Sequence, residues 1–332
     1  MSKNKKCPSN KNLIVGIGSA LVDILTYEED DFLQKTSAVK GGMTLVEKDF
    51  IEQTLSKTRN NASIVPGGSA CNTAVGIGKL GGKARFVGKC GGGSMGSLLK
   101  SSLKKNNVEP LLFASSLATG RVLSIITPDA QRSMFTFLGA SSEMTTDEIA
   151  GDHFSDVAIV HLEGYLLFNP ELVYSVLKRA REVGARVSLD LASYTVVEDS
   201  RDVLDDIVDR FVDILIANED EARAFTGHTD EKEAMVSLSQ RADIAALKVG
   251  ERGSYVSERG NIVKIEPMTG EGVVVDTTGA GDLWASGFLY GLANGYPIEI
   301  CGKIGSACGY EVCQAIGAAI PDEGWERIRR LI

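Results

Sequence analysis

The residues best suited to carry out chemistry lie in one glycine-rich stretch near the end of the chain, Asp276-Thr-Thr-Gly-Ala-Gly-Asp282. The valines that precede it, Val273 to Val275, predict the end of a buried strand. The apolar residues that follow it recur at four-residue steps and predict one face of a helix, namely Trp284, Phe288 and Leu292. Asn294-Gly295, followed by Pro297, is a helix stop signal. The stretch is therefore predicted to join a strand to a helix through a tight loop.

This loop has the properties of an anion-binding site. Its small residues leave the backbone N–H groups of Gly279, Ala280 and Gly281 unshielded, and the positive end of the helix dipole lies beside them. Asp282 differs from its neighbours, because a carboxylate adds negative charge there. It can be interpreted as a residue that caps the helix, or as a base held beside the place where negative charge gathers. The stretch alone leaves both interpretations open.

Two further polar side chains follow glycine-rich segments in the N-terminal part of the chain. Leu13 to Gly18 is a short apolar run that predicts a buried first strand, and Asp23 stands among apolar residues just beyond it. Such a position faces the ligand crevice of an open α/β sheet, although a turn aspartate is the alternative. Gly67-Gly68 predicts a second glycine-rich helix start. Asn72, about one turn inside it, could bond to a hydroxyl group or merely support helix packing.

The C-terminal half supplies two more polar clusters at predicted strand ends. Asn218 and Glu221 are three residues apart and share one face of a starting helix. Their oxygens could hold a hydrated Mg²⁺, but taken alone the pair is better explained as an N-cap with an acidic first turn. Lys248-Val-Gly-Glu-Arg-Gly ends the next strand in glycines, Gly250 and Gly253, which either leave room for a flat ligand or form a turn.

From residue 141 onward, predicted strands alternate with predicted helices. The strands are residues 157–162, 185–191, 214–217 and 244–249, and the helices are residues 170–183, 199–210 and 231–241. This alternation predicts an α/β fold, a doubly wound, mainly parallel sheet flanked by helices, with ligands at the carboxyl ends of the strands.

A second, smaller sheet is also predicted. Residues 111–127 and 133–138 alternate apolar and polar side chains around a turn signal at Pro128, which is typical of a hairpin. Together with residues 25–46, where Gly41-Gly42 suggests an extended pair, the hairpin is expected to form a small β-sheet lid over the site. Residues 13–332 are expected to form one domain that includes this lid.

The amino-acid composition and net charge of the chain argue against several classes of function. The chain has 332 residues, of which 43% are hydrophobic and 24% are charged, as is ordinary for globular proteins. The net charge of -9 argues against a general nucleic-acid surface, so local donors must bind any anionic substrate. No apolar run approaches the roughly 18 residues that a membrane span needs. Residues 1–12 are polar and lysine-rich, and they are interpreted as a disordered tail rather than a secretory signal.

The cysteines and histidines give no sign of a metal or redox centre. No two of the six cysteines have the C-x-x-C spacing of such a site. The three histidines are scattered along the chain, which makes a histidine-based metal site or catalytic triad a poor explanation. We therefore expect reduced, structural thiols in a cytoplasmic protein.

Taken together, these motifs resemble those of the ribokinase-like (PfkB) carbohydrate kinases. Asp276–Asp282 resembles their C-terminal signature, and Pro66-Gly-Gly-Ser-Ala-Cys-Asn72-Thr is similar to their N-terminal glycine-rich signature. Asn218-x-x-Glu221 resembles their magnesium-associated motif, and Lys248-Val-Gly-Glu-Arg-Gly their nucleotide-side turn. The resemblance runs from about residue 13 to about residue 325, in the family's order. Gly18–Asp23 and His161-Leu-Glu-Gly-Tyr-Leu look most like the adenosine-kinase-type branch, although Ser19 stands where that branch often has asparagine.

The resemblance implies ATP-dependent phosphorylation of a primary hydroxyl group on a nucleoside or sugar. Asp282 would be the base that accepts the proton of the hydroxyl group. The amides of Gly279, Ala280 and Gly281 would form an anion hole for the transferring group. The residues implied in acceptor binding are Asp23, Gly67, Gly68, Asn72 and Arg132. Arg132, on the hairpin, resembles a lid arginine that reaches the phosphate side, although a solvated arginine fits equally well.

The resemblance also implies a nucleotide side and metal sites. The residues implied on the nucleotide side are Asn218, Lys248, Gly250, Gly253, Thr277, Gly279 and Gly281, with part of helix 301–310 near the adenine. Asn218 and Glu221 would support Mg²⁺ through water. Asp276, Thr278, Ala315 and Gly317 match a region that often binds K⁺ in this family. Closure of the lid would exclude water, and an exposed edge or face of the lid would allow a homodimer.

Other classes of protein fit the sequence less well. A nicotinamide-dependent oxidoreductase requires G-x-G-x-x-G after the first strand, but Leu21 stands where the third glycine belongs. A catalytically silent relative is a distant third hypothesis, because Asp282 and the anion-hole glycines are all present. The acceptor stays open: adenosine is the first choice and another nucleoside the second. Ribose, fructose and 2-keto-3-deoxygluconate are the sugar alternatives.

Overall fold

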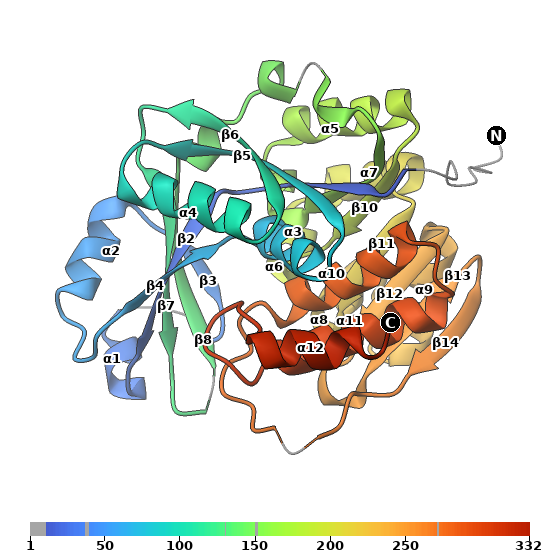
Figure 1. Cartoon of the computed structure of the whole chain (residues 1–332). Helices are drawn as coiled ribbons and strands as arrows, with labels where there is room; N and C mark the ends of the chain where they lie inside the picture. Colours follow the sequence, from blue (N-terminus) through green and yellow to red (C-terminus); the bar gives the residue numbers. More distant parts are fainter. Residues whose placement is uncertain (1–10, 37–39, 130, 150–151, 271) are drawn as a thin grey trace.

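The computed structural model describes residues 11–36, 40–129, 131–149, 152–270 and 272–332. Within these residues the strands form two sheets that meet at an angle (Figure 1). The large sheet has nine strands in the order β14-β13-β12-β11-β10-β9-β1-β5-β6, and the small sheet has five in the order β3-β8-β7-β2-β4. Residues 1–10 of the predicted tail lie outside the described residues.

The large sheet is mainly parallel. Its strands are β1 (Leu13–Ile17), β5 (Lys83–Gly91), β6 (Val108–Ser115), β9 (Val157–Glu163), β10 (Arg186–Asp190), β11 (Ile214–Asn218), β12 (Ile244–Lys248), β13 (Ser254–Glu258) and β14 (Asn261–Ile265). Every pairing from β12 to β6 is parallel, and only β13 and β14 pair antiparallel at the edge. The carboxyl ends of β1, β9, β10, β11 and β12 therefore meet at one rim. The predicted doubly wound, mainly parallel sheet is confirmed.

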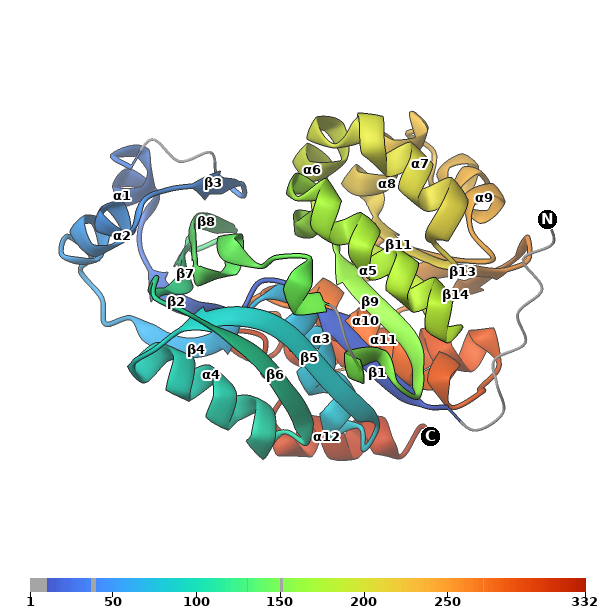
Figure 2. The same cartoon turned by 90° about the horizontal axis from the view of Figure 1, so that it is seen from above.

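Helices cover both faces of the large sheet (Figure 2). One face carries α5 (Pro170–Val183), α6 (Tyr194–Asp199), α7 (Arg201–Phe211), α8 (Glu219–Thr226) and α9 (Glu231–Arg241). The other carries α3 (Ser69–Lys79), α4 (Ser94–Lys105), α10 (Ala280–Ala293) and α11 (Ile298–Val312), with α12 (Asp322–Arg329) packed on α11. The described residues also include short 3₁₀ turns: η1 (Ala140–Glu143), η2 (Asp147–Ile149), η3 (Asp152–Phe154), η4 (Gly164–Phe168) and η5 (Gly250–Arg252). No helix in these described segments is long and apolar enough to cross a membrane.

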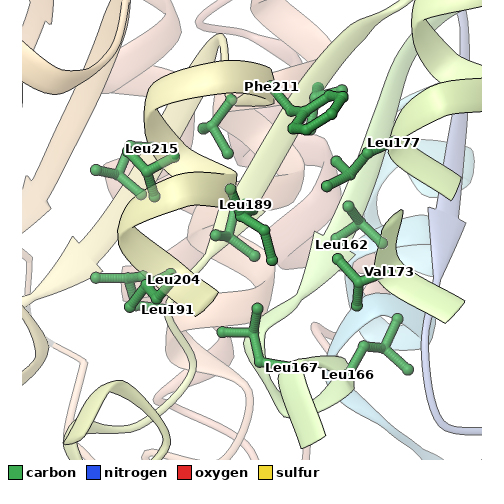
Figure 3. Close-up of a cluster of buried hydrophobic side chains, with 14 of the residues drawn as sticks. Leu162, Leu166, Leu167, Val173, Leu177, Leu189, Leu191, Leu204, Phe211 and Leu215 are labelled. Atoms are coloured by element: carbon green, nitrogen blue, oxygen red, sulfur yellow. The ribbon is translucent and has the colours of Figure 1, made fainter. Parts of the chain in front are cut away.

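The largest core lies between the sheet and helices α5 to α9. Figure 3 shows its centre, where Leu162 and Leu189 from neighbouring strands face Leu177 of α5 and Phe211 of α7. Leu162, Leu177 and Leu189 are each at most 1% exposed. Burial of each such side chain contributes on the order of 1.5–3 kcal/mol to folding. This packing makes the strand ends a rigid platform for the polar residues that follow them.

The small sheet alternates strictly between two environments. Its strands are β2 (Leu21–Tyr27), β3 (Met43–Leu45), β4 (Ser63–Gly67), β7 (Thr119–Ile126) and β8 (Arg132–Gly139). Ile24 and Leu123 point to the outer side, where they pack against α1 (Asp30–Gln34) and α2 (Lys48–Leu55). Asp23 and Val122, one residue earlier on the same strands, face a cavity on the inner side. The sheet therefore separates a hydrophobic core from a ligand-accessible wall, as period-two side-chain geometry requires.

Several predicted boundaries differ from the structure. Val273 to Val275 form no strand, and Val273 and Val274 are 75% and 60% exposed, so the prediction of a buried strand is wrong. Residues 111–127 split between the sheets, because β6 pairs with β5 and only β7 belongs to the small sheet. The small sheet also contains β4 and begins at Leu21, whereas among the described residues between 33 and 46 only β3 is extended. The predicted helix 199–210 corresponds to α7, with a separate α6 before it.

Candidate active site

A cavity among the described residues opens at the carboxyl rim of the large sheet and is faced by the small sheet. It encloses about 390 Å³. The predicted site residues that line it are Asp23, Gly68, Asn72, Arg132, Asn218, Glu221, Lys248, Thr277, Gly279, Ala280, Gly281 and Asp282. The predicted site residues outside its lining are Gly67, Gly250, Gly253, Asp276, Thr278, Ala315 and Gly317. The structure thus brings the predicted base, anion loop, acceptor residues and Asn-Glu pair to one cavity.

The anion loop ends in the first turn of α10. Gly279 is the residue before the helix and has a left-handed backbone, with φ +74°. A Cβ at this position would also collide with the side chain of Ala318. Glycine is required here both for the backbone conformation and for the space. Because the helix begins at Ala280, the first N–H groups of α10 lack partners within the helix, and that of Ala280 donates to the carbonyl oxygen of Thr277 at 3.2 Å.

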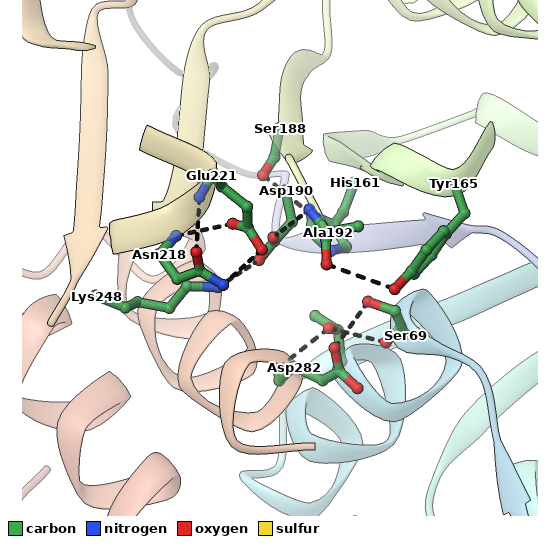
Figure 4. Close-up of polar contacts among 11 residues, drawn as sticks. Ser69, His161, Tyr165, Ser188, Asp190, Ala192, Asn218, Glu221, Lys248 and Asp282 are labelled. Carbon is green, nitrogen blue, oxygen red and sulfur yellow. Dashed lines mark hydrogen bonds and ion pairs between the residues drawn. The ribbon is translucent and has the colours of Figure 1, made fainter. Parts of the chain in front are cut away.

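Asp282 is held by α3 rather than by its own helix. Its Oδ1 accepts a hydrogen bond from Ser69 Oγ at 2.7 Å, and its Oδ2 accepts one from Asn72 Nδ2 at 2.9 Å. Burial raises the pKa of Asp282, against the opposing effect of the hydrogen bonds from Asn72 and Ser69. The interpretation of Asp282 as a helix cap is therefore not what the structure shows (Figure 4). The amide nitrogen of Asn72 is engaged in this contact, and it orients the carboxylate of Asp282.

Asp23 lies across the cavity on the wall formed by the small sheet. The side chain of Asp23 is buried, and its carboxylate occupies the space that a Cβ on Gly67 would need. Gly67 therefore serves this wall by making room for Asp23 rather than by lining the cavity. Burial raises the pKa of Asp23 to about 6, and the positive charge of Arg132 opposes this rise. Arg132 stands on the same wall at the start of β8.

Glu163 is a buried carboxylate of the site that the sequence analysis did not assign. It ends β9 and is 1% exposed. Its Oε1 accepts from the backbone N–H of Ser19 at 2.8 Å, and its Oε2 accepts from that of Ala70 at 2.9 Å. Burial raises the pKa of Glu163 to about 7, although the hydrogen bonds from Ala70 and Ser19 oppose the rise. Glu163 therefore ties the loop before Asp23 to the start of α3, which carries Asn72.

We predict that Glu163→Gln lowers both stability and acceptor affinity. A glutamine side chain has one oxygen acceptor, so its amide N–H₂ group would face the N–H of Ser19 or Ala70 and leave that donor unpaired. An unpaired buried donor costs about 1–3 kcal/mol. Urea unfolding should show this loss of unfolding free energy, and the KM of the acceptor should rise. Glu299→Gln, on the exposed first turn of α11, is the control, and equal stability of the two variants would contradict the prediction.

Asn218 and Glu221 form a complete capping box at the start of α8. Asn218 Oδ1 accepts from the backbone N–H of Glu221 at 2.9 Å, while Glu221 Oε2 accepts from the backbone N–H of Asn218 at 2.8 Å. Asn218 Nδ2 donates to Glu221 Oε1 at 2.7 Å. Burial raises the pKa of Glu221 to about 7, opposed by the charge of Lys248. Because these oxygens are already engaged, the pair fits contact with Mg²⁺ through water rather than direct coordination.

Lys248 and Asp190 form an ion pair beside this box. Lys248 ends β12 and reaches Asp190, which ends β10, with 2.9 Å between Nζ and Oδ2 (Figure 4). Asp190 is a second cavity residue that the sequence analysis missed. Gly250 and Gly253, with φ +56° and +92°, shape the turn after Lys248. A Cβ on Gly253 would collide with the carbonyl oxygen of Ile265, so this glycine is needed for the turn itself.

Asp276, the first residue of the anion loop, accepts hydrogen bonds that hold the loop in place. Its Oδ1 accepts from the backbone N–H and the hydroxyl group of Thr278 at 2.9 and 2.7 Å, and its Oδ2 accepts from the N–H of Gly317 at 2.8 Å. The side chain is fully buried. These contacts join the loop to the segment after α11, which includes Ala315. Among the described residues, no group of three or more His, Cys, Asp or Glu side chains is arranged to hold a metal ion.

A buried carboxylate at the N-terminus of a helix, in a cavity that a second carboxylate also lines, can remove a proton from a hydroxyl group beside a site for a transferring anion. The fold and this site define a small-molecule kinase. The chain belongs to the pfkB family of carbohydrate kinases, whose family model matches residues 35–324. Membership of this family implies ATP as the substrate that donates the phosphoryl group, and usually Mg²⁺.

Known relatives include both sugar and nucleoside kinases. The structure is similar to a probable sugar kinase from Rhizobium etli CFN 42, with a TM-score of 0.91, 31% identity, and coverage of 97% of this chain and 99% of that one. It is equally similar to adenosine kinase from Sinorhizobium meliloti, with a TM-score of 0.91, 30% identity, and coverage of 98% and 100%. The sequence is 27% identical to 5-dehydro-2-deoxygluconokinase of Bacillus subtilis (strain 168), over 89% of this chain and 87% of that protein.

Proposed function

We propose that this chain transfers the γ-phosphoryl group of ATP to a primary hydroxyl group of a nucleoside, with adenosine as the first choice. The observation that carries this proposal is the apolar surface beside Asp23 on the acceptor wall. Its residues are Leu21, Val122, Met134 and Leu138 from the small sheet, with Phe168 also lining the cavity. A nucleobase needs an apolar surface of this kind, whereas a free sugar offers mainly hydroxyl groups.

In the proposed reaction, the acceptor oxygen forms a bond to the γ-phosphorus of ATP. The bond from that phosphorus to the β,γ-bridging oxygen breaks, and its electron pair leaves with ADP. The proton of the hydroxyl group passes to Asp282, which Ser69 and Asn72 hold in place. The N–H groups of Gly279, Ala280 and Gly281 would bind the negative charge of the transferring group.

The proposed metal ions have separate places in this scheme. Mg²⁺ would neutralise phosphate charge when bound, and Asn218 and Glu221 would hold it through water, because their capping box leaves only the outer lone pairs of the oxygens free. Thr277, in the anion loop, and Lys248, just before the turn shaped by Gly250 and Gly253, would face the nucleotide. K⁺ would bind backbone oxygens of the loops that Asp276 joins, namely those at Asp276, Thr278, Ala315 and Gly317.

A sugar acid is the second candidate acceptor, and one observation favours it. The guanidinium group of Arg132 lines the cavity close to Asp23, with no ion-pair partner among the residues that the structure describes. A guanidinium group binds a carboxylate through two parallel hydrogen bonds. An acceptor such as 2-keto-3-deoxygluconate would supply that carboxylate, whereas with a nucleoside Arg132 would be left for the phosphate groups.

A kinase screen tests the choice of acceptor. ADP formation is measured with Mg-ATP and each of adenosine, other nucleosides, ribose, fructose and 2-keto-3-deoxygluconate, in K⁺ and in its absence. We expect kcat/KM for adenosine to exceed that for the best sugar by at least tenfold, which corresponds to about 1.4 kcal/mol. Phosphorus NMR should then find the phosphate on the primary hydroxyl group. Turnover with sugars alone would overturn the nucleoside assignment and leave the kinase class intact.

Assembly and location complete the proposal. The outer face of the small sheet is covered by α1 and α2, so a homodimer through this sheet would use a free edge, at β3 or β4.

We also place the protein in the cytoplasm, where ATP is abundant. The free thiols of Cys71, Cys301 and Cys308, which are buried without a disulfide partner, suit a reducing compartment.

A further inference from the structure

The ion pair between Lys248 and Asp190 places a positive charge deep in the cavity. Nζ of Lys248 donates to Oδ2 of Asp190 at 2.9 Å, and the two side chains are 14% and 7% exposed. Their strands, β12 and β10, flank β11 in the large sheet. A lysine ammonium group carries three N–H donors. Asp190 takes one of them, and no other hydrogen bond from Lys248 is found within the described ranges, so two donors remain for a ligand.

The ammonium group lies against the anion loop. A Cβ built on Gly281 would be 3.1 Å from Nζ of Lys248, so the missing side chain of Gly281 leaves the space that the ammonium group occupies. Lys248, Gly281 and Asp282 all line the same cavity. An anion bound by the N–H groups of Gly279 to Gly281 would therefore meet the lysine ammonium on one side. It would meet the acceptor hydroxyl group, beside Asp282, on another.

Asp190 is itself held in one orientation by the turn that follows β10. Its Oδ1 accepts from the backbone N–H of Ala192 at 3.1 Å. Ala192 has a left-handed backbone, with φ +64°, which is uncommon for a residue other than glycine. The hydroxyl group of Tyr165 donates to the carbonyl oxygen of Ala192 at 3.5 Å and supports the same turn. Strained turns of this kind persist where the surrounding structure fixes them.

From this geometry we infer that Lys248 is a further catalytic residue, whose ammonium group contacts the transferring phosphoryl group, and that Asp190 is a positioning residue that acts through Lys248. The inference rests on the proposed transfer beside Asp282 but is independent of the acceptor. As the bond between the γ-phosphorus and the β,γ-bridging oxygen breaks, negative charge grows on the phosphoryl oxygens and on ADP. Lys248 stabilises this charge, while the proton of the hydroxyl group still passes to Asp282.

The first test replaces Lys248 by methionine, which keeps the length of the side chain and removes its charge. We expect kcat to fall by about 10²–10³-fold, as on loss of a donor to transition-state charge, with the acceptor Kd changed by less than twofold. Lys48→Met is the matched control, because Lys48 makes the same substitution on the exposed side of α2, where it pairs with Glu52 at the surface. A Lys248 variant that raises the KM of ATP but keeps kcat within threefold of wild type would show a binding role only.

The second test asks whether Asp190 acts through Lys248. Asp190→Asn alone should lower kcat by about tenfold without changing the acceptor KM, because it loosens the ammonium group. In the Lys248→Met background the same substitution should have no further effect, since residues that act as a unit are not additive. Lys248→Met alone leaves the buried carboxylate of Asp190 without its ion-pair partner, which destabilises the fold. The double variant has no such carboxylate and therefore controls for misfolding of Lys248→Met. Additive losses would overturn the positioning role of Asp190.

A third measurement needs no acceptor and separates this inference from the proposed substrate. Calorimetry compares the affinity of each variant for Mg-ADP and for Mg-ADP with aluminium fluoride, which mimics the transferring phosphoryl group. Lys248→Met should lose at least tenfold in affinity for the fluoride complex and less than threefold for ADP. Equal losses for both ligands, or no preference of the wild type for the fluoride complex, would refute the catalytic role. If nucleosides are not phosphorylated but this discrimination holds, only the choice of acceptor fails.

Discussion

Replacement of Asp282 by asparagine is expected to lower kcat by about 10²–10⁴-fold, the range over which a positioned general base acts. The amide cannot accept the proton of the acceptor hydroxyl group. The fold should survive, because the hydroxyl group of Ser69, 2.7 Å from Oδ1 of Asp282, can accept as well as donate. Steady-state kinetics with the acceptor identified by the screen give kcat, and calorimetry gives the Kd of ATP and of the acceptor, which should change little.

The matched control for this variant is Asp49→Asn. Asp49 also lies in the first turn of a helix, but on the exposed side of α2. It should keep the wild-type kcat. If Asp282→Asn phosphorylated the acceptor as fast as the wild-type chain, the assignment of Asp282 as the base would be wrong. Loss of ATP binding in this variant would instead indicate that the carboxylate of Asp282 contributes to ATP binding rather than to proton transfer.

Asp23→Asn is expected to reduce kcat/KM for the acceptor by about 10²–10⁴-fold. Each hydrogen bond from a hydroxyl group to a charged carboxylate contributes about 1.5–3 kcal/mol, and a buried carboxylate at this place can accept two. The loss should appear mainly in the Kd of the acceptor rather than in the affinity for ATP. Asp31→Asn, on α1 at the outer side of the small sheet, makes the same charge change at an exposed place and is the control.

The pH dependence of acceptor binding gives an independent check on Asp23. Because its pKa is raised to about 6, chiefly by burial, the carboxylate is ionised above that pH and becomes protonated below it. Acceptor affinity should therefore fall as pH drops through about 6. Measurement in the Asp282→Asn background removes the titration of Asp282. Adding Asp23→Asn should abolish the fall in affinity near pH 6, and a profile that lacks this fall while Asp23 is still present would contradict the assignment.

Local patterns predicted much of the large sheet, but they could not show which apolar segments have partners. Residues 231–241 form a helix with the predicted bounds, because its apolar residues lie within the segment and Asp230, directly before it, caps its N-terminus. Val273 to Val275 have the composition of a strand, yet the sheet ends at β14 and offers them no neighbour. The N–H of Val275 bonds instead to the carbonyl oxygen of Cys313, a contact between segments far apart in the sequence.

The site shows the same division between local and distant information. Asn218 was identified because polar side chains at strand ends face the ligand crevice, whereas Asp23, expected just beyond the first strand, lies inside β2 of the small sheet. Glu163 and Asp190 end their strands in the same way, so the rule would have found them if it had been applied to every strand. The contact of Asn72 with Asp282 spans 210 residues of sequence. It depends on the packing of α3 against α10, which no local pattern reports.

The position of Asp23 in the cavity depends on the register of β2 in the small sheet. Asp23 and Ile24 are neighbours in β2, yet one faces the ligand cavity and the other packs under α1 and α2. A slip of one residue against β4 or β7 would exchange them. It would bury an unpaired carboxylate in a hydrophobic core, at a cost that proteins avoid, and would turn Ile24 toward the substrate. The carboxylate of Asp23 therefore also disfavours folding in a wrong register, since only the observed register leaves it in the polar cavity.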